Sequence, residues 1–287
     1  MGVEAIKTVA VLGAGTMGNG IAHVFARAGY NVILRDIERS FLDRAIEVIA
    51  KNIDREIKKG KLAESERAWV LGRVRPVTNM KEIVAADFAV EAVPEKMEIK
   101  RAVLQEADAI LRPEVILASN TSSISITALA AMTKRPARFV GMHFMNPVPV
   151  MALVEVIRAL QTSDAAFETT MQLAEKLGKN PVAVNDAPGF VSNRVLMPLI
   201  NEAVYAVMEG VATVEAVDAV MKLGMNHPMG PLELADFIGL DVCVDILQVL
   251  HDGLGDPKYR ACPLLKKYVA AGWLGRKSGR GFYNYAS

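Results

Sequence analysis

Apolar and polar positions follow two different periods along the first two thirds of the chain. Short runs rich in β-branched residues, such as Thr8–Leu12, are bounded by glycine and predict buried strands. Residues 16–28 and 40–59 carry apolar side chains at helical spacing, and each stretch stops at a glycine. The expected strands are 8–12, 31–34, 73–77, 87–93, 115–118, 139–143, 153–157 and 182–184. This alternation predicts the α/β class, with a Rossmann-type doubly wound parallel sheet covered on both faces.

The pattern changes near residues 186–189, where Pro and Gly interrupt it. Beyond that point no convincing strand is expected before the tail. Helices are expected over 190–209, 213–223, 231–251 and 263–271. We therefore expect a first domain over 1–186 and a smaller all-α domain over 187–287, which is long enough to build its own core.

The balance of charges limits the kinds of partner that the protein is expected to bind. The 287 residues include 33 Lys and Arg against 32 Asp and Glu, a net charge of +1. Such a balance gives no whole-molecule attraction to nucleic acid or to an anionic membrane, and neither partner is expected. A charged ligand would need a local basic patch.

Two cysteines, Cys243 and Cys262, allow one disulfide, but the favoured interpretation is two free thiols in a reducing compartment. No spacing of residues suggests zinc or any other metal. The N-terminus lacks the layout of a signal peptide, and no apolar stretch approaches the roughly 18 residues of a membrane span. We expect a cytoplasmic protein.

The first strand runs into Gly13-Ala14-Gly15-Thr16-Met17-Gly18, which fits the G-x-G-x-x-G pattern of dinucleotide-binding loops. The pattern alone is weak, but here it follows a strand and opens a helix. Gly13 permits the tight turn, Gly15 lets the backbone approach the pyrophosphate, and Gly18 lets helix and strand pack closely. The helix N-terminus, at Thr16 and Met17, then offers N–H groups to phosphates.

Asp36 ends the second strand, where a carboxylate can accept hydrogen bonds from the ribose hydroxyls of a dinucleotide. The same carboxylate would repel the 2′-phosphate of NADP, so NAD is the favoured cofactor. Arg35 and Arg39 flank Asp36 and could weaken that preference, which leaves NADP open.

His143 ends the strand 139–143, and ligands of doubly wound sheets bind at the carboxyl ends of strands. A lone histidine is more often structural than catalytic, but its position at the carboxyl end of a strand favours both interpretations about equally. Glu155 lies among apolar residues in the strand 153–157, so its carboxylate is either buried and in need of a partner or an exposed charge on an edge strand. A pairing with His143 would give an acid–base dyad.

Two polar segments contain further candidate residues for the active site. Ser119–Ser123 follows the strand 115–118 and belongs to the same rim, although Ser123 or Ser125 could simply cap a helix. Asn193 lies near the start of the first helix of the second domain, where it could also cap the helix or face water.

At these residues the chain resembles the 3-hydroxyacyl-CoA dehydrogenases. The resemblance spans nearly the whole chain and is carried by GAGTMG, SNTSS, GMHFMNPVPVMALVEVIR, PGFVSNR, HPMGPLELADFIGLD and GWLGRKSGRGFYNY. It is greatest to the short bacterial members that act on 3-hydroxybutyryl-CoA. The family pattern has a phenylalanine where Met145 stands, and we expect repacking there without loss of activity.

The resemblance implies roles for individual residues. His143 matches the catalytic histidine of the family, and Glu155 the carboxylate that pairs with it. Ser122 and Asn193 match polar residues at the reacting oxygens of the substrate. The cofactor contacts implied on the nicotinamide side are Glu95, Lys100 and Asn120.

The resemblance also implies the substrates and the partners. Acetoacetyl-CoA and 3-hydroxybutyryl-CoA would be interconverted with NAD(H), and the protein would form a homodimer. The basic run Arg55–Lys61 would be read from the sequence alone as a solvated helix face, but its position matches the CoA-contacting element of the family. Arg55 and Lys59, spaced four residues apart, share one face of that helix.

Two other functions stay open at this point. One is a dehydrogenase of a free small hydroxy acid, against which the basic run and the Ser119–Ser123 segment argue. The other is a non-catalytic NAD-binding protein, against which the presence of the whole expected catalytic set argues.

Overall fold

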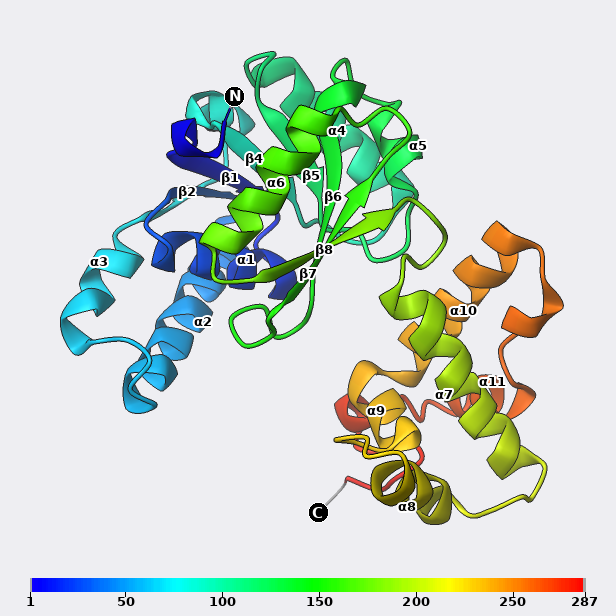
Figure 1. Ribbon diagram of the computed structural model, residues 1–287. Coiled ribbons are helices and arrows are strands. Elements are labelled where there is room, and N and C mark those ends of the chain that lie inside the picture. The colour runs from blue at the N-terminus through cyan, green and yellow to red at the C-terminus, as the bar shows by residue number, and fades with distance from the viewer. Residues whose placement is uncertain (1, 286–287) are drawn as a thin grey trace. The chain divides into compact units, whose positions relative to one another are not determined.

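The computed structural model of the protein describes residues 2–285. It divides into two compact units, the first ending at Ala187 and the second beginning at Pro188 (Figure 1). The first unit is built on one eight-stranded sheet and the second is helical, so the predicted fold class is confirmed.

The sheet has the order β3-β2-β1-β4-β5-β6-β7-β8. Its strands are β1 (Thr8–Leu12), β2 (Asn31–Arg35), β3 (Val74–Val77), β4 (Phe88–Glu91), β5 (Ile116–Ser119), β6 (Phe139–Phe144), β7 (Leu153–Arg158) and β8 (Asn180–Asn185). The first six run parallel. The chain turns from β1 to one side for β2 and returns to the other side for β4, which creates the switch point where such sheets bind ligands.

The helices of the first unit connect these strands. They are α1 (Thr16–Arg27), α2 (Arg39–Lys58), α3 (Arg67–Leu71), α4 (Met97–Ile110), α5 (Ile126–Ala130) and α6 (Asp164–Lys176). Residues of α1, α2 and α6 share one apolar core with the Val9 and Val11 face of β1. Because neighbouring side chains of a strand point to opposite faces, Ala10 and Leu12 face the other way, and both faces are buried.

The expectation of a fully parallel sheet is wrong for β7, which runs antiparallel to β6, and β8 then follows β7 in parallel. The reason lies in the connection 145–152, which contains no helix. A parallel return needs a crossover of about a dozen residues or more, whereas a short loop reverses the chain.

The second unit contains α7 (Ser192–Met208), α8 (Val214–Gly224), α9 (Pro231–Ile238), α10 (Leu240–Leu254) and α11 (Pro263–Ala270) around its own apolar core. The single helix expected over 231–251 is two helices. Gly239 separates them with a φ of 107°, a value that side-chain-bearing residues avoid.

The two cysteines lie in this unit as free, buried thiols. Burial raises the pKa of the Cys243 thiol to about 12. Among residues 2–285, no helix combines the length and the apolar character needed to cross a membrane.

Candidate active site

The glycine loop between β1 and α1 forms a cradle that only glycines allow. A Cβ on Gly13 would lie 2.6 Å from the carbonyl oxygen of Ala92, and one on Gly18 would lie 1.8 Å from the carbonyl oxygen of Gly13. Gly15, in contrast, faces open space, since a Cβ added there would have no heavy atom within 4 Å. It also caps α1 without a side-chain bond, so the first N–H groups of α1, from Thr16 and Met17 on, remain for a ligand. The loop therefore fits the pyrophosphate of a dinucleotide.

Asp36 directly follows β2 and stands beside this cradle. Its Oδ2 accepts the N–H of Ala14 at 2.6 Å, and its Oδ1 accepts the N–H of Ile37 at 2.7 Å. Each carboxylate oxygen has a second lone pair, so both oxygens retain the capacity to accept a ribose hydroxyl. Asp36 thus shapes the glycine loop and offers hydrogen-bond acceptors beside it.

The structure brings His143 and Glu155 together. The register of β6 and β7 places them directly opposite each other, and the imidazole Nδ1 lies 2.8 Å from Glu155 Oε2. His143 is 7% exposed and Glu155 is 2% exposed, and β7 lies between β6 and β8, so the carboxylate is not an edge-strand charge. The carboxylate orients the ring and can stabilise its protonated form, which is the arrangement that a histidine acid–base catalyst needs.

The polar segment after β5 is tied to the residue that follows His143. Asn120 Oδ1 accepts the N–H of Phe144 at 2.9 Å. The alternative role of the segment, helix capping, falls to Ser125, whose Oγ accepts the N–H of Ala128 at the start of α5. Residues 119–123 are therefore held at the carboxyl edge of the sheet by contacts other than a cap.

Glu95 holds the next part of this segment. Its Oε1 accepts the N–H of Ser122 at 3.0 Å, the N–H of Ser123 at 3.2 Å and the hydroxyl of Thr121. Burial by itself would raise the pKa of Glu95, but the Lys100 ammonium and these donors outweigh it and lower the pKa. Glu95 is therefore a carboxylate that fixes the backbone at Ser122.

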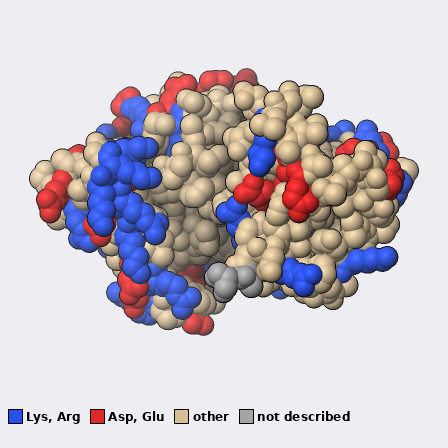
Figure 2. Space-filling view, turned by 90° about the horizontal axis from the view of Figure 1, so that it is seen from below, with Lys and Arg blue, Asp and Glu red and all other residues tan. Residues whose placement is uncertain are grey.

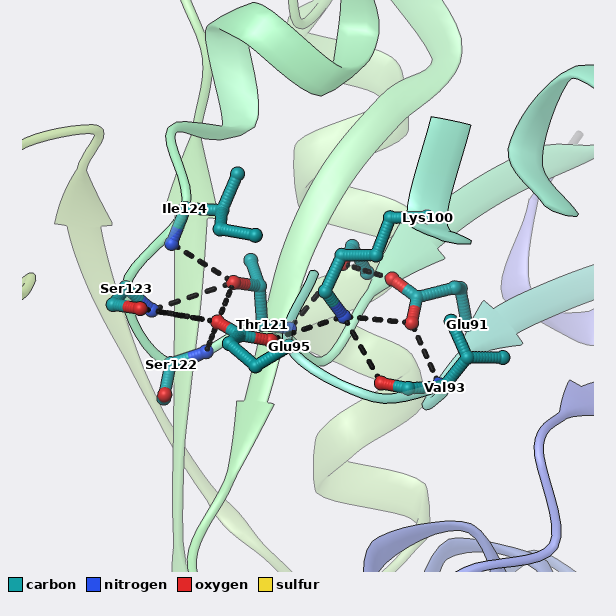
Figure 3. A network of polar contacts seen from close by, with 9 residues as sticks. Glu91, Val93, Glu95, Lys100, Thr121, Ser122, Ser123 and Ile124 are labelled. Carbon is teal, nitrogen blue, oxygen red and sulfur yellow. Dashed lines mark hydrogen bonds and ion pairs between the residues drawn. The ribbon is translucent and has the colours of Figure 1, made fainter. Parts of the chain in front are cut away.

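Lys100 links Glu95 to a second carboxylate, which the sequence analysis did not single out (Figure 3). The Nζ of Lys100 lies 2.7 Å from Glu91 Oε1 and 3.1 Å from Glu95 Oε2. Glu91 is fully buried at the end of β4 and also accepts the hydroxyl of Ser119 at 2.6 Å. The signal that identifies Glu155, a carboxylate within an apolar run, is present at residues 88–93 as well.

One predicted site residue belongs to the second unit. Asn193 belongs to the second unit, where it is the second residue of α7 and is buried. Its N–H is bonded to the carbonyl of Gly189 at 3.1 Å. The alternative that Asn193 faces water is therefore wrong for its side chain.

Arg55 and Lys59 lie at the C-terminal end of α2, and both are exposed. Arg55 bonds only weakly to its neighbour, with 3.2 Å between its guanidinium and Asn52 Oδ1. Figure 2 shows Lys and Arg side chains gathered in a band on the side of the molecule where α2 lies. The local basic patch that an anionic ligand would need is thus present.

Comparisons with known proteins match both units of the chain to one family. Residues 8–187 match the family model "3-hydroxyacyl-CoA dehydrogenase, NAD binding domain", and residues 189–285 match "3-hydroxyacyl-CoA dehydrogenase, C-terminal domain". A probable 3-hydroxybutyryl-CoA dehydrogenase of Bacillus subtilis is 57% identical over 98% of both chains. One of Deinococcus radiodurans is 58% identical over 96% of this chain and 99% of the other.

Among solved structures, the (S)-3-hydroxybutyryl-CoA dehydrogenase PaaH1 of Ralstonia eutropha is similar with a TM-score of 0.96 and 50% identity. The match covers 99% of this chain and 100% of that chain.

Proposed function

The chain belongs to the 3-hydroxyacyl-CoA dehydrogenase family, an NAD-dependent oxidoreductase family, and from this premise we propose that it interconverts 3-hydroxybutyryl-CoA and acetoacetyl-CoA. The observation that carries the proposal is the buried pair of His143 and Glu155, 2.8 Å apart at the carboxyl edge of the sheet. The identity of the relatives, 57% and 58% over nearly the full length, supports the short acyl chain.

In the oxidative direction, His143 removes the proton from the C3 hydroxyl of the substrate. NAD, when bound, supplies the acceptor for the hydride that leaves C3. Glu155 stabilises the imidazolium that forms, and in the reductive direction His143 returns the proton to the C3 oxygen. Acid–base help of this kind contributes about 10²–10⁴-fold to the rate.

The other site residues bind and orient the substrate and the cofactor. Ser122 and Asn193 are assigned to the oxygens of the acyl group, and Glu95, Lys100 and Asn120 to the nicotinamide. The cradle from Gly13 to Gly18 holds the pyrophosphate. Arg55 and Lys59 attract the phosphates of CoA.

NAD is the proposed cofactor rather than NADP, because the carboxylate of Asp36 would repel a 2′-phosphate. Arg39, which could offset this repulsion, is engaged with Asp43 at 2.7 Å. We also propose that the protein forms a homodimer, which the exposed apolar side chains of the second unit support. The proposed location is the cytoplasm.

A substrate screen tests the proposal. Acetoacetyl-CoA, longer 3-ketoacyl-CoAs and free acetoacetate are each assayed with NADH and with NADPH. We expect the largest kcat/KM with acetoacetyl-CoA and NADH. Equal values for acetoacetyl-CoA and free acetoacetate would instead identify a dehydrogenase of free hydroxy acids. If none of these substrates were turned over, the protein would be a non-catalytic NAD-binding protein.

A further inference from the structure

A buried ammonium holds the loop that joins the two strands of the His143–Glu155 pair. Lys179 immediately precedes β8 and is only 7% exposed. Its Nζ donates to the carbonyl of Val148 at 2.5 Å and to the carbonyl of Met151 at 2.7 Å. Both carbonyls belong to the loop 145–152, which leaves β6 just after His143 and enters β7 just before Glu155.

The same loop is pressed against α1, the helix that begins at the glycine cradle. A Cβ on Gly20 would lie 2.8 Å from the Cβ of Val148, so a glycine is needed for the loop to approach this closely. Val148 is 2% exposed and belongs to the apolar core shared with α1. The loop is thus fixed from two sides, by Lys179 and by α1.

The ammonium is held there against the cost of burial. Removal from water disfavours a charge, and burial together with the nearby Arg27 guanidinium lowers the pKa of Lys179. What the ammonium provides in return is two directed hydrogen bonds to one loop. Charged donors bind carbonyls more strongly than neutral ones, so these two bonds hold the loop firmly.

We propose that Lys179 is a positioning residue for the reaction, which fixes the loop 145–152 against α1 and thereby holds His143 where its imidazole can exchange a proton with the C3 oxygen of the substrate. The inference rests on the proposed function, since it assigns to Lys179 an effect on the rate through His143. A displacement of a catalytic group by about 1 Å can cost about 100-fold in rate.

The test replaces Lys179 by Met, which keeps the length and removes the donors. We expect kcat to fall between about tenfold and about 100-fold, with the Kd for NADH changed less than about twofold. Hydrogen exchange of the loop amides, including those of Val150 and Met151 that bond to Pro147, should become faster. Lys179→Arg should recover part of kcat, and added n-propylamine should raise the kcat of Lys179→Ala.

The matched control is Lys176→Met. Lys176 lies on the adjoining helix end with 39% side-chain exposure and pairs with Glu4, so its replacement removes one charge from the same region while both hydrogen bonds from Lys179 to the loop stay in place. Gly20→Ala is the second variant, and it displaces the loop from the α1 side if Lys179→Met fails to fold.

A folded Lys179→Met or Gly20→Ala with wild-type kcat would overturn the inference. A loss of kcat accompanied by unchanged loop exchange and no recovery with arginine or amine would also overturn it, since the role would then be general stability. If His143→Gln retains full turnover, the proposed function fails independently of Lys179.

Discussion

At the scale of single residues, the site depends on charged groups that each have a partner, and most of them are buried. Glu155 meets His143, while Glu91 and Glu95 share Lys100. Glu155 could be found in the sequence because a carboxylate in an apolar strand needs a partner. Glu91 carries the same signal but was missed, because its partner, Lys100, comes from a helix and not from a predicted strand end.

Replacing His143 by Gln should lower kcat by about 100-fold or more, because the imidazole is the only proton carrier assigned to C3. The Kd for NADH, measured by nicotinamide fluorescence, should be nearly unchanged. His251→Gln, at a side chain 40% exposed in the second unit, is the control and should keep wild-type turnover. Unchanged turnover in His143→Gln would remove the histidine from the mechanism.

Replacing Asp36 by Ala should raise the KM for NADH more than the KM for NADPH, because the carboxylate is the proposed reader of the ribose. Asp36 also accepts the N–H of Ala14, so the loss of loop structure would affect both cofactors. Asp36→Asn removes the charge and keeps one acceptor, because its single amide oxygen can still accept the N–H of Ala14, while the bond from the N–H of Ile37 is lost. An unchanged ratio of the two KM values in both variants would show that Asp36 does not discriminate.

At the scale of elements, the strands from β1 to β8 and most helices could be predicted from the sequence, because their periodicities are local. The reversal of β7 could not, because it depends on the loop 145–152 and not on the strand itself. The division of 231–251 at Gly239 was missed because an isolated glycine inside an apolar helical pattern is often tolerated.

The C-terminal end of α2 is predicted to bind the phosphates of CoA through Arg55 and Lys59. Arg55→Ala and Lys59→Ala should each raise the KM for acetoacetyl-CoA, because an exposed cation attracts the phosphates, and should leave a short thioester without the nucleotide unaffected. Arg44→Ala, about three turns earlier on the same helix and also exposed, is the matched control. Equal losses on both substrates would mean that the basic run acts in another way.

The start of β1 is held to β4 by Asp87, whose Oδ2 accepts the N–H groups of Lys7 and Thr8. Partial burial would raise the pKa of Asp87, but these bonds and the Arg112 guanidinium outweigh it and lower the pKa. A lowered carboxyl pKa stabilises the fold above the unfolded-state pKa, and this contribution is lost as the pH falls through the folded-state pKa.

Asp87→Asn should therefore lower the free energy of unfolding by about 1 kcal/mol or more near neutral pH. The difference from wild type should shrink as the pH falls from about 5 to about 3. Urea unfolding at several pH values measures it, and a difference that stays constant down to the lowest pH would contradict the assignment.

At the scale of the whole molecule, the residues proposed for binding and catalysis come from both units of the chain. The cradle, the His143–Glu155 pair and the Glu91–Lys100–Glu95 network belong to the first, and Asn193 belongs to the second. A sequence reveals such a division through a change of pattern. It does not reveal which exposed apolar side chains meet another subunit, because the same spacing also marks a core.

The second unit exposes several large apolar side chains, among them Leu223 at 88% and Val195 at 63%. If they lie in a subunit interface, light scattering should give twice the chain mass of 31.1 kDa. Leu223→Arg should then shift the mass toward the monomer. Leu160→Arg, at a leucine 91% exposed in the first unit, is the control and should leave the mass unchanged.

The hairpin of β6 and β7 also decides where the chain tolerates a change of length. One residue inserted into β7 ahead of Glu155 would turn its carboxylate to the opposite face of the sheet, because side chains alternate along a strand. The same insertion in the exposed turn between α7 and α8 would be absorbed without moving any residue of the site. Homologues should therefore differ in length at that turn and agree in length across β6, its loop and β7.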